Sequence, residues 1–314
     1  MNYKVTKKAY KLLSLFLIWA AWFCPSWAAD SLTLQRVTDE VYAIVGDLGN
    51  RSEENLGNNA TFGFVVTSEG VVLIDSGGTY QGAQEIDRLI KSVTDVPVVT
   101  VINTGGQDHR WLGNRYFKDA GAQIIASKNA VEDQKSRTQD QFIMLGNLVG
   151  DEGLQGTNAV YADKTFEDEL ELQVGDTTFL ILHHGQAHTP GDSFVWLPKE
   201  EVVFTGDIVY VDRMLNVGTQ SNSKSWIDVY QAMATYEPQY LIPGHGQVTD
   251  LQQANKDTYD YLVFLRKSVS GFMESGGDIT DIGSIDQSKY SYLLNFESLS
   301  GRNAQQVYTE LEWE

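Results

Sequence analysis

Four short polar segments each follow an apolar run with the length of a β-strand, and this pattern limits the folds open to the chain. The segments are residues 103–110 (NTGGQDHR), 187–192 (AHTPGD), 205–207 (TGD) and 243–246 (PGHG). Each segment contains His, Asp or both. In α/β proteins, functional side chains gather in the loops at the carboxyl ends of the strands. The pattern therefore predicts an α/β fold with one cluster of His and Asp side chains.

Apolar runs and helical spacings place further elements around these segments. Strands and helices alternate through both halves of the chain, which predicts two sheets stacked face to face with helices outside. The predicted strands are residues 41–45, 62–67, 71–75, 98–102, 123–126, 177–182, 193–197, 201–205 and 240–242. The predicted helices are residues 86–93, a segment from about residue 112, residues 129–147 and 225–236, and polar helices from about residue 250 to the end. Residues 148–165, with three glycines, are predicted as a loop.

The first 28 residues resemble a secretory signal peptide. Four lysines precede an apolar run at residues 12–23, and Ser26-Trp27-Ala28 places small residues where a signal peptidase reads the chain. The apolar run falls short of the roughly 20 residues that span a bilayer. We therefore expect cleavage after Ala28 and a periplasmic or secreted protein without stable membrane insertion.

The composition narrows the chemistry of the mature chain. The one cysteine, Cys24, lies in the signal segment, so disulfides, Cys nucleophiles and thiolate metal sites are excluded after cleavage. Loss of the four lysines takes the formal net charge from −19 to −23. So acidic a chain repels the phosphates of nucleic acid, and a small-molecule substrate is the expected partner.

Four segments, in this order, resemble motifs of the metallo-β-lactamase fold superfamily. They are residues 72–77 (VLIDSG), 188–192 (HTPGD), 204–207 (FTGD) and 242–246 (IPGHG). The resemblance covers about residues 35–250. It implies an αββα sandwich over residues 31–250, with residues 251–314 as a helical C-terminal extension packed on that domain.

The second motif departs from the family pattern Thr-His-x-His-x-Asp-His-x-Gly-Gly-Asn. Residues 104–114 (TGGQDHRWLGN) have the same length, and an alignment without gaps puts Gly105 and Gln107 at the two leading histidines. A slip of one residue aligns Asp108-His109 with the Asp-His pair of the family instead. Both registers lose the two leading histidines, so the resemblance implies a reduced site with one metal ion.

The remaining His and Asp residues predict one three-ligand metal site. His109, Asp207 and His245 are kept in both registers, and the fourth position is open to His188, Asp108 or water. Three protein ligands and an open position are what a catalytic zinc ion needs. Because His and carboxylate without Cys form the ligand set of hydrolytic zinc sites, one Zn²⁺ ion is expected, with Fe or Mn possible.

Asp108 and Arg110 are the candidate catalytic residues. Asp108 could orient the nucleophilic water or act as a base. Arg110 could bind a substrate carboxylate through two hydrogen bonds, or form an ion pair with an acid of the chain. Asp75 is expected to hold loop amides rather than the metal. Gly105-Gly106 could make room for a substrate, or could be a relic of lost ligands.

Two further histidines end the strand that leads to His188. One of His183 and His184 should face inward and the other outward, and both are expected to be structural. His184 remains a possible substitute for a lost metal ligand.

The expected function is that of an exported metal-dependent hydrolase. A metal-bound hydroxide would attack an ester, amide or lactam-type bond, and the metal would stabilise the oxyanion. The alternative is a non-catalytic or accessory periplasmic protein of a redox or sulfur system that retains the fold. Metal content separates the two hypotheses, because the second does not require a metal ion.

Overall fold

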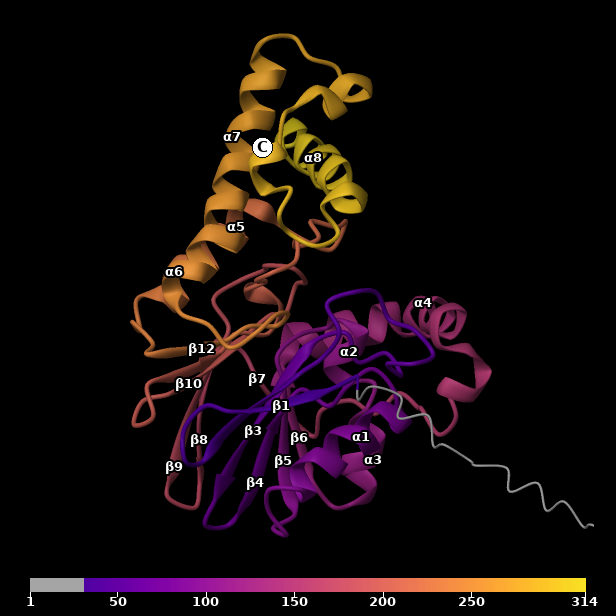
Figure 1. Ribbon diagram of the computed structural model, residues 1–314, viewed down its shortest axis with the longest axis vertical. Coiled ribbons are helices and arrows are strands. Elements are labelled where there is room, and N and C mark those ends of the chain that lie inside the picture. The colour runs from indigo at the N-terminus through magenta and orange to yellow at the C-terminus, as the bar shows by residue number, and fades with distance from the viewer. Residues whose placement is uncertain (1–30) are drawn as a thin grey trace, which may run out of the picture. The chain divides into compact units, whose positions relative to one another are not determined.

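Two β-sheets lie face to face in the computed structural model, which describes residues 31–314 (Figure 1). The first sheet has seven strands in the order β1-β2-β3-β4-β5-β6-β7, and the second has five in the order β12-β11-β10-β9-β8. The predicted signal peptide lies outside the described residues. The strands are β1 (Thr33–Arg36), β2 (Val41–Val45), β3 (Thr61–Thr67), β4 (Gly70–Ile74), β5 (Val98–Asn103), β6 (Gln123–Ser127), β7 (Lys164–Phe166), β8 (Glu169–Val174), β9 (Thr177–Leu182), β10 (Phe194–Leu197), β11 (Val202–Phe204) and β12 (Tyr240–Ile242).

The strand directions bring several loops to one edge. Strands β4 to β7 pair in parallel, as do β11 and β12, while the other neighbours are antiparallel. Parallel strands end at the same edge of a sheet, so the loops after β4 and β5 meet there. Backbone hydrogen bonds join this edge to the second sheet, from Thr61 N to Gly244 O (2.7 Å) and from Ser193 N to Thr104 O (2.7 Å).

Apolar side chains of both sheets fill the space between them. Val65 and Ile102 of the first sheet and Ile181 and Phe204 of the second are buried in one cluster. The sheets approach closely at Gly63, where an added Cβ would lie 2.2 Å from a ring atom of Phe204. The Phe204 ring therefore takes the place of a side chain on β3.

Helices cover the outer faces of the two sheets (Figure 1). Ile86 and Ile90 of α1 pack with Phe62 and Leu73 on the first sheet, and Trp226 of α5 belongs to the cluster on the second. This order of layers confirms the predicted αββα sandwich. The helices are α1 (Tyr80–Lys91), α2 (Asp108–Trp111), α3 (Asn114–Asp119), α4 (Lys128–Gly153), α5 (Ser223–Ala234), α6 (Leu251–Ala254), α7 (Asp260–Glu274) and α8 (Phe296–Glu312), with short helical turns η1 (Gly206–Ile208), η2 (Asn255–Tyr259), η3 (Ile279–Ser284) and η4 (Ser288–Tyr290).

The C-terminal helices are attached to the sandwich through a buried polar contact. Asn303 of α8 accepts a hydrogen bond from Val217 N (2.9 Å) and donates one to Leu215 O (2.9 Å). Val307 of α8 and Leu262 of α7 share the apolar cluster that contains Trp226. These contacts hold α8 beside the loop that follows Asp207. Among the described residues, no helix has the length and apolar character needed to cross a membrane.

The structure differs from the predicted elements where the sequence signal is weak. Helix α4 continues to Gly153, so the first residues of the predicted loop 148–165 are helical, although Gly150 breaks the helical geometry with φ 71°. The predicted helix from about residue 112 is two short helices, α2 and α3. Strand β8 was not predicted, because its alternating Glu and Leu residues lie at an exposed edge and form no apolar run.

The contact between Gly63 and Phe204 predicts a cost for any side chain at this position. Gly63→Ala is expected to lower the free energy of unfolding by about 1–3 kcal/mol, because the added methyl group overpacks the core. Gly271→Ala is the matched control, since Gly271 is exposed in α7 with no atom near its Cβ position. Urea unfolding measures both variants, and equal stability of the two would contradict the close packing of Phe204 against Gly63.

Candidate metal centre

Three of the predicted ligands come together at the joined edge of the two sheets. His109 lies in α2 after β5, Asp207 in η1 after β11, and His245 in the loop after β12. His109 Nε2 is 3.3 Å from Asp207 Oδ2, and His245 Nε2 is 3.2 Å from Asp207 Oδ1. One ligand atom from each residue lies within 4.8 Å of the others, and all three side chains are buried. Within residues 31–314, this is the group of His and Asp side chains that could hold a metal ion.

The polar atoms of this group lack partners that the protein would otherwise supply. His109 Nε2 and Asp207 Oδ2 are buried and make no hydrogen bond within the described part of the chain. His245 Nδ1 donates to Asn59 O (2.8 Å), which leaves a lone pair on Nε2 directed at the Asp207 carboxylate. Two buried acceptors this close repel each other unless a cation lies between them. The donor set therefore fits a divalent cation such as Zn²⁺.

Arg110 holds the Asp207 carboxylate in its ionised form. Arg110 Nη2 donates to Asp207 Oδ1 (2.6 Å) and to Gly244 O (2.8 Å), while Nη1 donates to Thr61 O and Asp75 Oδ2 (both 3.0 Å). Burial alone would raise the pKa of Asp207, but the positive charge of Arg110 outweighs burial, and that pKa lies well below its ordinary value. At neutral pH, Asp207 is therefore an anion.

The position of Arg110 does not fit the predicted role in substrate binding. Its side chain is 0% exposed and does not line the cavity beside the three ligands, and both terminal nitrogens donate to acceptors of the chain. Of the two interpretations of Arg110, the structure shows the ion pair with acids of the chain. Asp75 accepts from Thr104 N (2.7 Å) and Thr104 Oγ1 (2.8 Å), the expected hold on loop amides.

Asp108 contacts His109 and does not line the cavity. It is buried, forms an ion pair with Arg51, and accepts from His109 N (2.8 Å). Burial would raise the pKa of Asp108, but Arg51 and His109 outweigh it and hold that pKa below its ordinary value. Asp108 is not part of the His–Asp–His group. A carboxylate of such low basicity in this place is better suited to orienting His109 than to accepting a proton from water.

The Nδ1 atom of His109 has two neighbours of opposite character. Arg51 Nη2 is 2.7 Å away and can only donate, while Asp108 Oδ1 is 3.2 Å away and can only accept while ionised. Donation from Nδ1 to Asp108 leaves Nε2 free to face Asp207, the arrangement that metal-bound histidines commonly have with a carboxylate. A cation at Nε2 therefore favours the contact with Asp108 over the contact with Arg51.

His188 faces the same cavity without joining the group of three. Its Nδ1 donates to Asn216 O (3.0 Å), and burial lowers the pKa of His188 to about 4. The ring is therefore neutral, with Nε2 unprotonated. His183 contacts Asp192 O and Asn129 within the fold, whereas His184 is exposed and does not line the cavity. Both fit the expected structural role, and neither supplies a substitute ligand.

The altered motif is packed tightly and leaves no empty space. Gln134 Nε2 donates to Gly105 O (3.1 Å), and Gln141 Nε2 donates to Gly106 O (2.8 Å), so α4 supports the loop. An added Cβ at Gly105 would lie 2.5 Å from Asp192 Oδ1. Of the two sequence interpretations, room for a substrate does not describe this loop, because other groups fill the space at Gly105.

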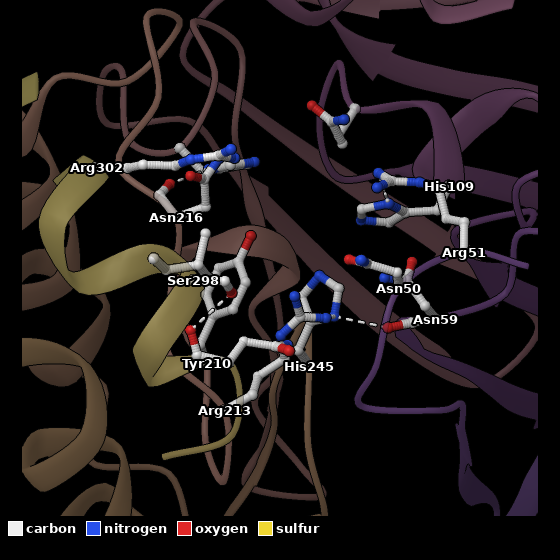
Figure 2. Close-up of a pocket in the computed structure, with 14 residues that line it drawn as sticks. Asn50, Arg51, Asn59, His109, Tyr210, Arg213, Asn216, His245, Ser298 and Arg302 are labelled. Atoms are coloured by element: carbon white, nitrogen blue, oxygen red, sulfur yellow. Dashed lines mark hydrogen bonds between the residues drawn. The ribbon is translucent and has the colours of Figure 1, made fainter. Parts of the chain in front are cut away.

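The cavity beside the group is lined by its two histidines and also by residues that no sequence motif indicated. It has a volume of about 200 Å³. Figure 2 shows Arg51 and His109 on one side, and Arg302 and Asn216 on the other. Arg302 comes from α8, so the C-terminal extension closes part of the cavity. Tyr210 stacks on His245 with ring centroids 4.6 Å apart. No local motif marks these residues, and proximity in the fold alone identifies them.

The four layers and the His–Asp–His group define an αββα protein with a candidate metal centre at the joined edge of its sheets. The sequence profile described as the Metallo-beta-lactamase superfamily matches residues 56–245, more than half of the chain. The chain belongs to this superfamily, which confirms the resemblance found in the motifs.

Known relatives agree with this assignment. A protein named Metallo-beta-lactamase type 2, from Elizabethkingia meningoseptica, is 26% identical over 203 residues, or 63% of this chain and 73% of the relative. A metallo-beta-lactamase from Pontibacter korlensis has a similar fold, with a TM-score of 0.59, 20% identity, and coverage of 74% of this chain and 99% of that one. The sec-alkylsulfatase Pisa1 from Pseudomonas sp. has a TM-score of 0.71 and 18% identity, and the match covers 88% of this chain but 50% of that one.

The ion pairs of Arg110 predict a large effect of its removal. Arg110→Gln is expected to lower the free energy of unfolding by about 3–5 kcal/mol, because Asp207 and Asp75 would remain buried without their cation. Arg115→Gln is the matched control, since it breaks only an exposed pair with Asp119 worth about 0–1 kcal/mol. Urea unfolding of both variants is the measurement. Similar losses in the two would contradict the structural role of Arg110.

The packing of Gly105 predicts that the family's histidine cannot be restored there. Gly105→His is expected to destabilise the protein by about 1–3 kcal/mol, because its Cβ would press on Asp192, which Thr189 N holds at 2.7 Å. Gln107→His, on the cavity side, is expected to be tolerated. Thermal unfolding compares the two. A Gly105→His protein as stable as the unchanged chain would show that the loop has room for a ligand.

Proposed function

We propose that the protein is a metal-dependent hydrolase of small molecules with a single divalent cation at His109, Asp207 and His245. The observation that carries this proposal is the pair of buried, unpartnered ligand atoms, His109 Nε2 and Asp207 Oδ2, beside a cavity. Zn²⁺ suits this ligand set, and Fe or Mn are the alternatives. The bond broken is of the ester, amide or lactam type.

Each residue of the site has a separate task in this proposal. His109, Asp207 and His245 hold the cation, and Asp108 keeps His109 in the orientation that presents Nε2. A zinc ion supplies Lewis acidity and lowers the pKa of bound water to about 7. His188, neutral and with a free Nε2, either completes the ligand set or accepts a hydrogen bond from water in the cavity.

The names of the relatives support hydrolysis but not one substrate. Metallo-beta-lactamase is the name of the relative from Elizabethkingia meningoseptica, and sec-alkylsulfatase is that of the Pseudomonas structure. Both names fit cleavage of a small molecule. Export remains part of the proposal on the strength of the signal-like residues 1–28.

A non-catalytic or accessory role in a redox or sulfur system is the second candidate. The observation that favours it is the altered motif, in which Gly105 and Gly106 are fixed by Gln134 and Gln141. A protein that has lost two metal ligands and packed their loop could retain the fold for binding alone. The same protein would then need no metal ion.

Metal content and hydrolysis, measured on the same proteins, test the proposal. The purified chain is expected to hold about one zinc or iron ion, and His245→Ala is expected to lose it because two ligands bind zinc poorly. His184→Ala is the matched control, since His184 is exposed and lies outside the cavity. Elemental analysis gives the ion count, and a panel of chromogenic esters, amides and β-lactams gives the activity.

The outcomes separate the two candidate functions. Hydrolysis that falls at least about 100-fold in His245→Ala but not in His184→Ala supports the hydrolase. Two ions per chain would show that further residues have become ligands. A folded protein without metal, whose melting temperature does not change on addition of zinc, would favour the accessory role.

A further inference from the structure

The cavity beside the candidate metal centre is lined by cations and by no carboxylate among the described residues. Arg51, Arg213 and Arg302 all contribute to its wall, together with neutral polar side chains. The whole chain has a formal net charge of −19, so the sign of the cavity is opposite to that of the protein. A charged cleft of this kind concentrates ligands of the opposite sign, which here are anions.

Arg213 is a buried cation that lacks an acidic partner. Its residue is 7% exposed, and no carboxylate of residues 31–314 lies within ion-pair distance. Nη1 donates to Gly49 O (3.2 Å) and lies 3.3 Å from His245 Nδ1, while Nε is buried with no hydrogen bond in this part of the chain. A buried charge is costly unless it is paired and its hydrogen bonds are made. The guanidinium of Arg213 is therefore able to bind an anionic group.

The other arginines of the site show what a paired guanidinium looks like here. Arg110 has two carboxylate partners, and Arg51 has Asp108. Arg213 is also largely buried and differs from both in having no carboxylate partner, whereas a buried Nε without a hydrogen bond is common to all three arginines. The missing partner of Arg213 is therefore a feature of this position and not of the site as a whole.

Arg302 adds a second cation from a different element. It lies on α8 and makes no ion pair or hydrogen bond with other described residues. Figure 2 places Arg302 beside Asn216, across the cavity from His109. The anchoring of α8 through Asn303 keeps this helix, and the base of Arg302, at the cavity wall.

We propose that the substrate carries an anionic group, a carboxylate, sulfate or phosphate, that Arg213 and Arg302 bind at the α8 side of the cavity. This proposal rests on the proposed hydrolase function, since it names the substrate class of the same site. The anion would occupy one side while the bond to be broken lies toward His109, Asp207 and His245. Guanidinium groups bind such oxyanions through charge-assisted hydrogen bonds, often two at a time. Helix α8, outside the matched family segment 56–245, thereby becomes a determinant of specificity.

Anion binding by the full chain, free of metal and with zinc added, tests the inference directly. Calorimetric titrations with sulfate, inorganic phosphate and acetate are run at low ionic strength, first after treatment with a chelator. Arg213→Gln and Arg302→Gln are expected to weaken binding by about 10-fold or more each, through loss of a charge-assisted contact. Arg115→Gln, an exposed arginine of α3, is the matched control and is expected to bind like the unchanged chain. Arg302 is exposed, so its variant reports on binding even where Arg213→Gln fails to fold.

The titration results distinguish the anion-binding subsite from the proposed hydrolase function. Binding in the metal-free protein that falls in both arginine variants supports the subsite, and the anion with the highest affinity identifies its chemistry. Binding seen only with zinc, and unchanged in the arginine variants, would place the anion on the metal and overturn the subsite while supporting a metal centre. A protein that takes up no metal but binds anions through both arginines would overturn the hydrolase and leave the subsite standing. No binding of any of the three anions overturns the inference.

Discussion

The buried guanidinium of Arg110 joins the segments that the two sheets bring to the site. It donates to Thr61 O and Asp75 on the side of the first sheet, and to Asp207 and Gly244 O on the side of the second. A buried ion pair needs its remaining hydrogen bonds to be made, and Arg110 makes them at both terminal nitrogens, while its Nε is buried without a partner among the described residues. The orientation of the Asp207 carboxylate therefore depends on the packing of the sandwich. Arg110 and His245 both approach Oδ1, and Oδ2 is left to face His109.

Local patterns in the sequence predict those parts of the fold and the site that neighbouring residues determine. Apolar runs marked most strands, and the polar segments behind them contain His109, Asp207 and His245, which the fold brings together. The exposed strand β8 was not predicted, because an edge strand buries few side chains and forms no apolar run. The arginines that line the cavity were not predicted either, because residues far apart in the chain meet there only through tertiary packing.

The second motif shows why a departure from a family pattern is hard to interpret from sequence. The replacement of a histidine by Gly105 implies a lost ligand, and nothing in the motif says what fills its space. In the structure, the Asp192 carboxylate approaches Gly105, and two glutamines of α4 bind the backbone of the loop. Glycine is required there by the close approach of other groups. The loop is a built part of the fold, and the reduced ligand set belongs to a stable arrangement.

The charges around the cavity couple the two proposed ligands. Burial holds the pKa of His245 well below its ordinary value, so its ring is neutral, and Arg110 already neutralises much of the charge on Asp207. A divalent cation bound there would add positive charge near Arg213 and Arg51. An anionic group at α8 would offset that charge, and each ligand would then raise the affinity of the site for the other, as linkage requires. The acidic surface of the chain opposes non-specific anion binding, so this attraction is confined to the cavity.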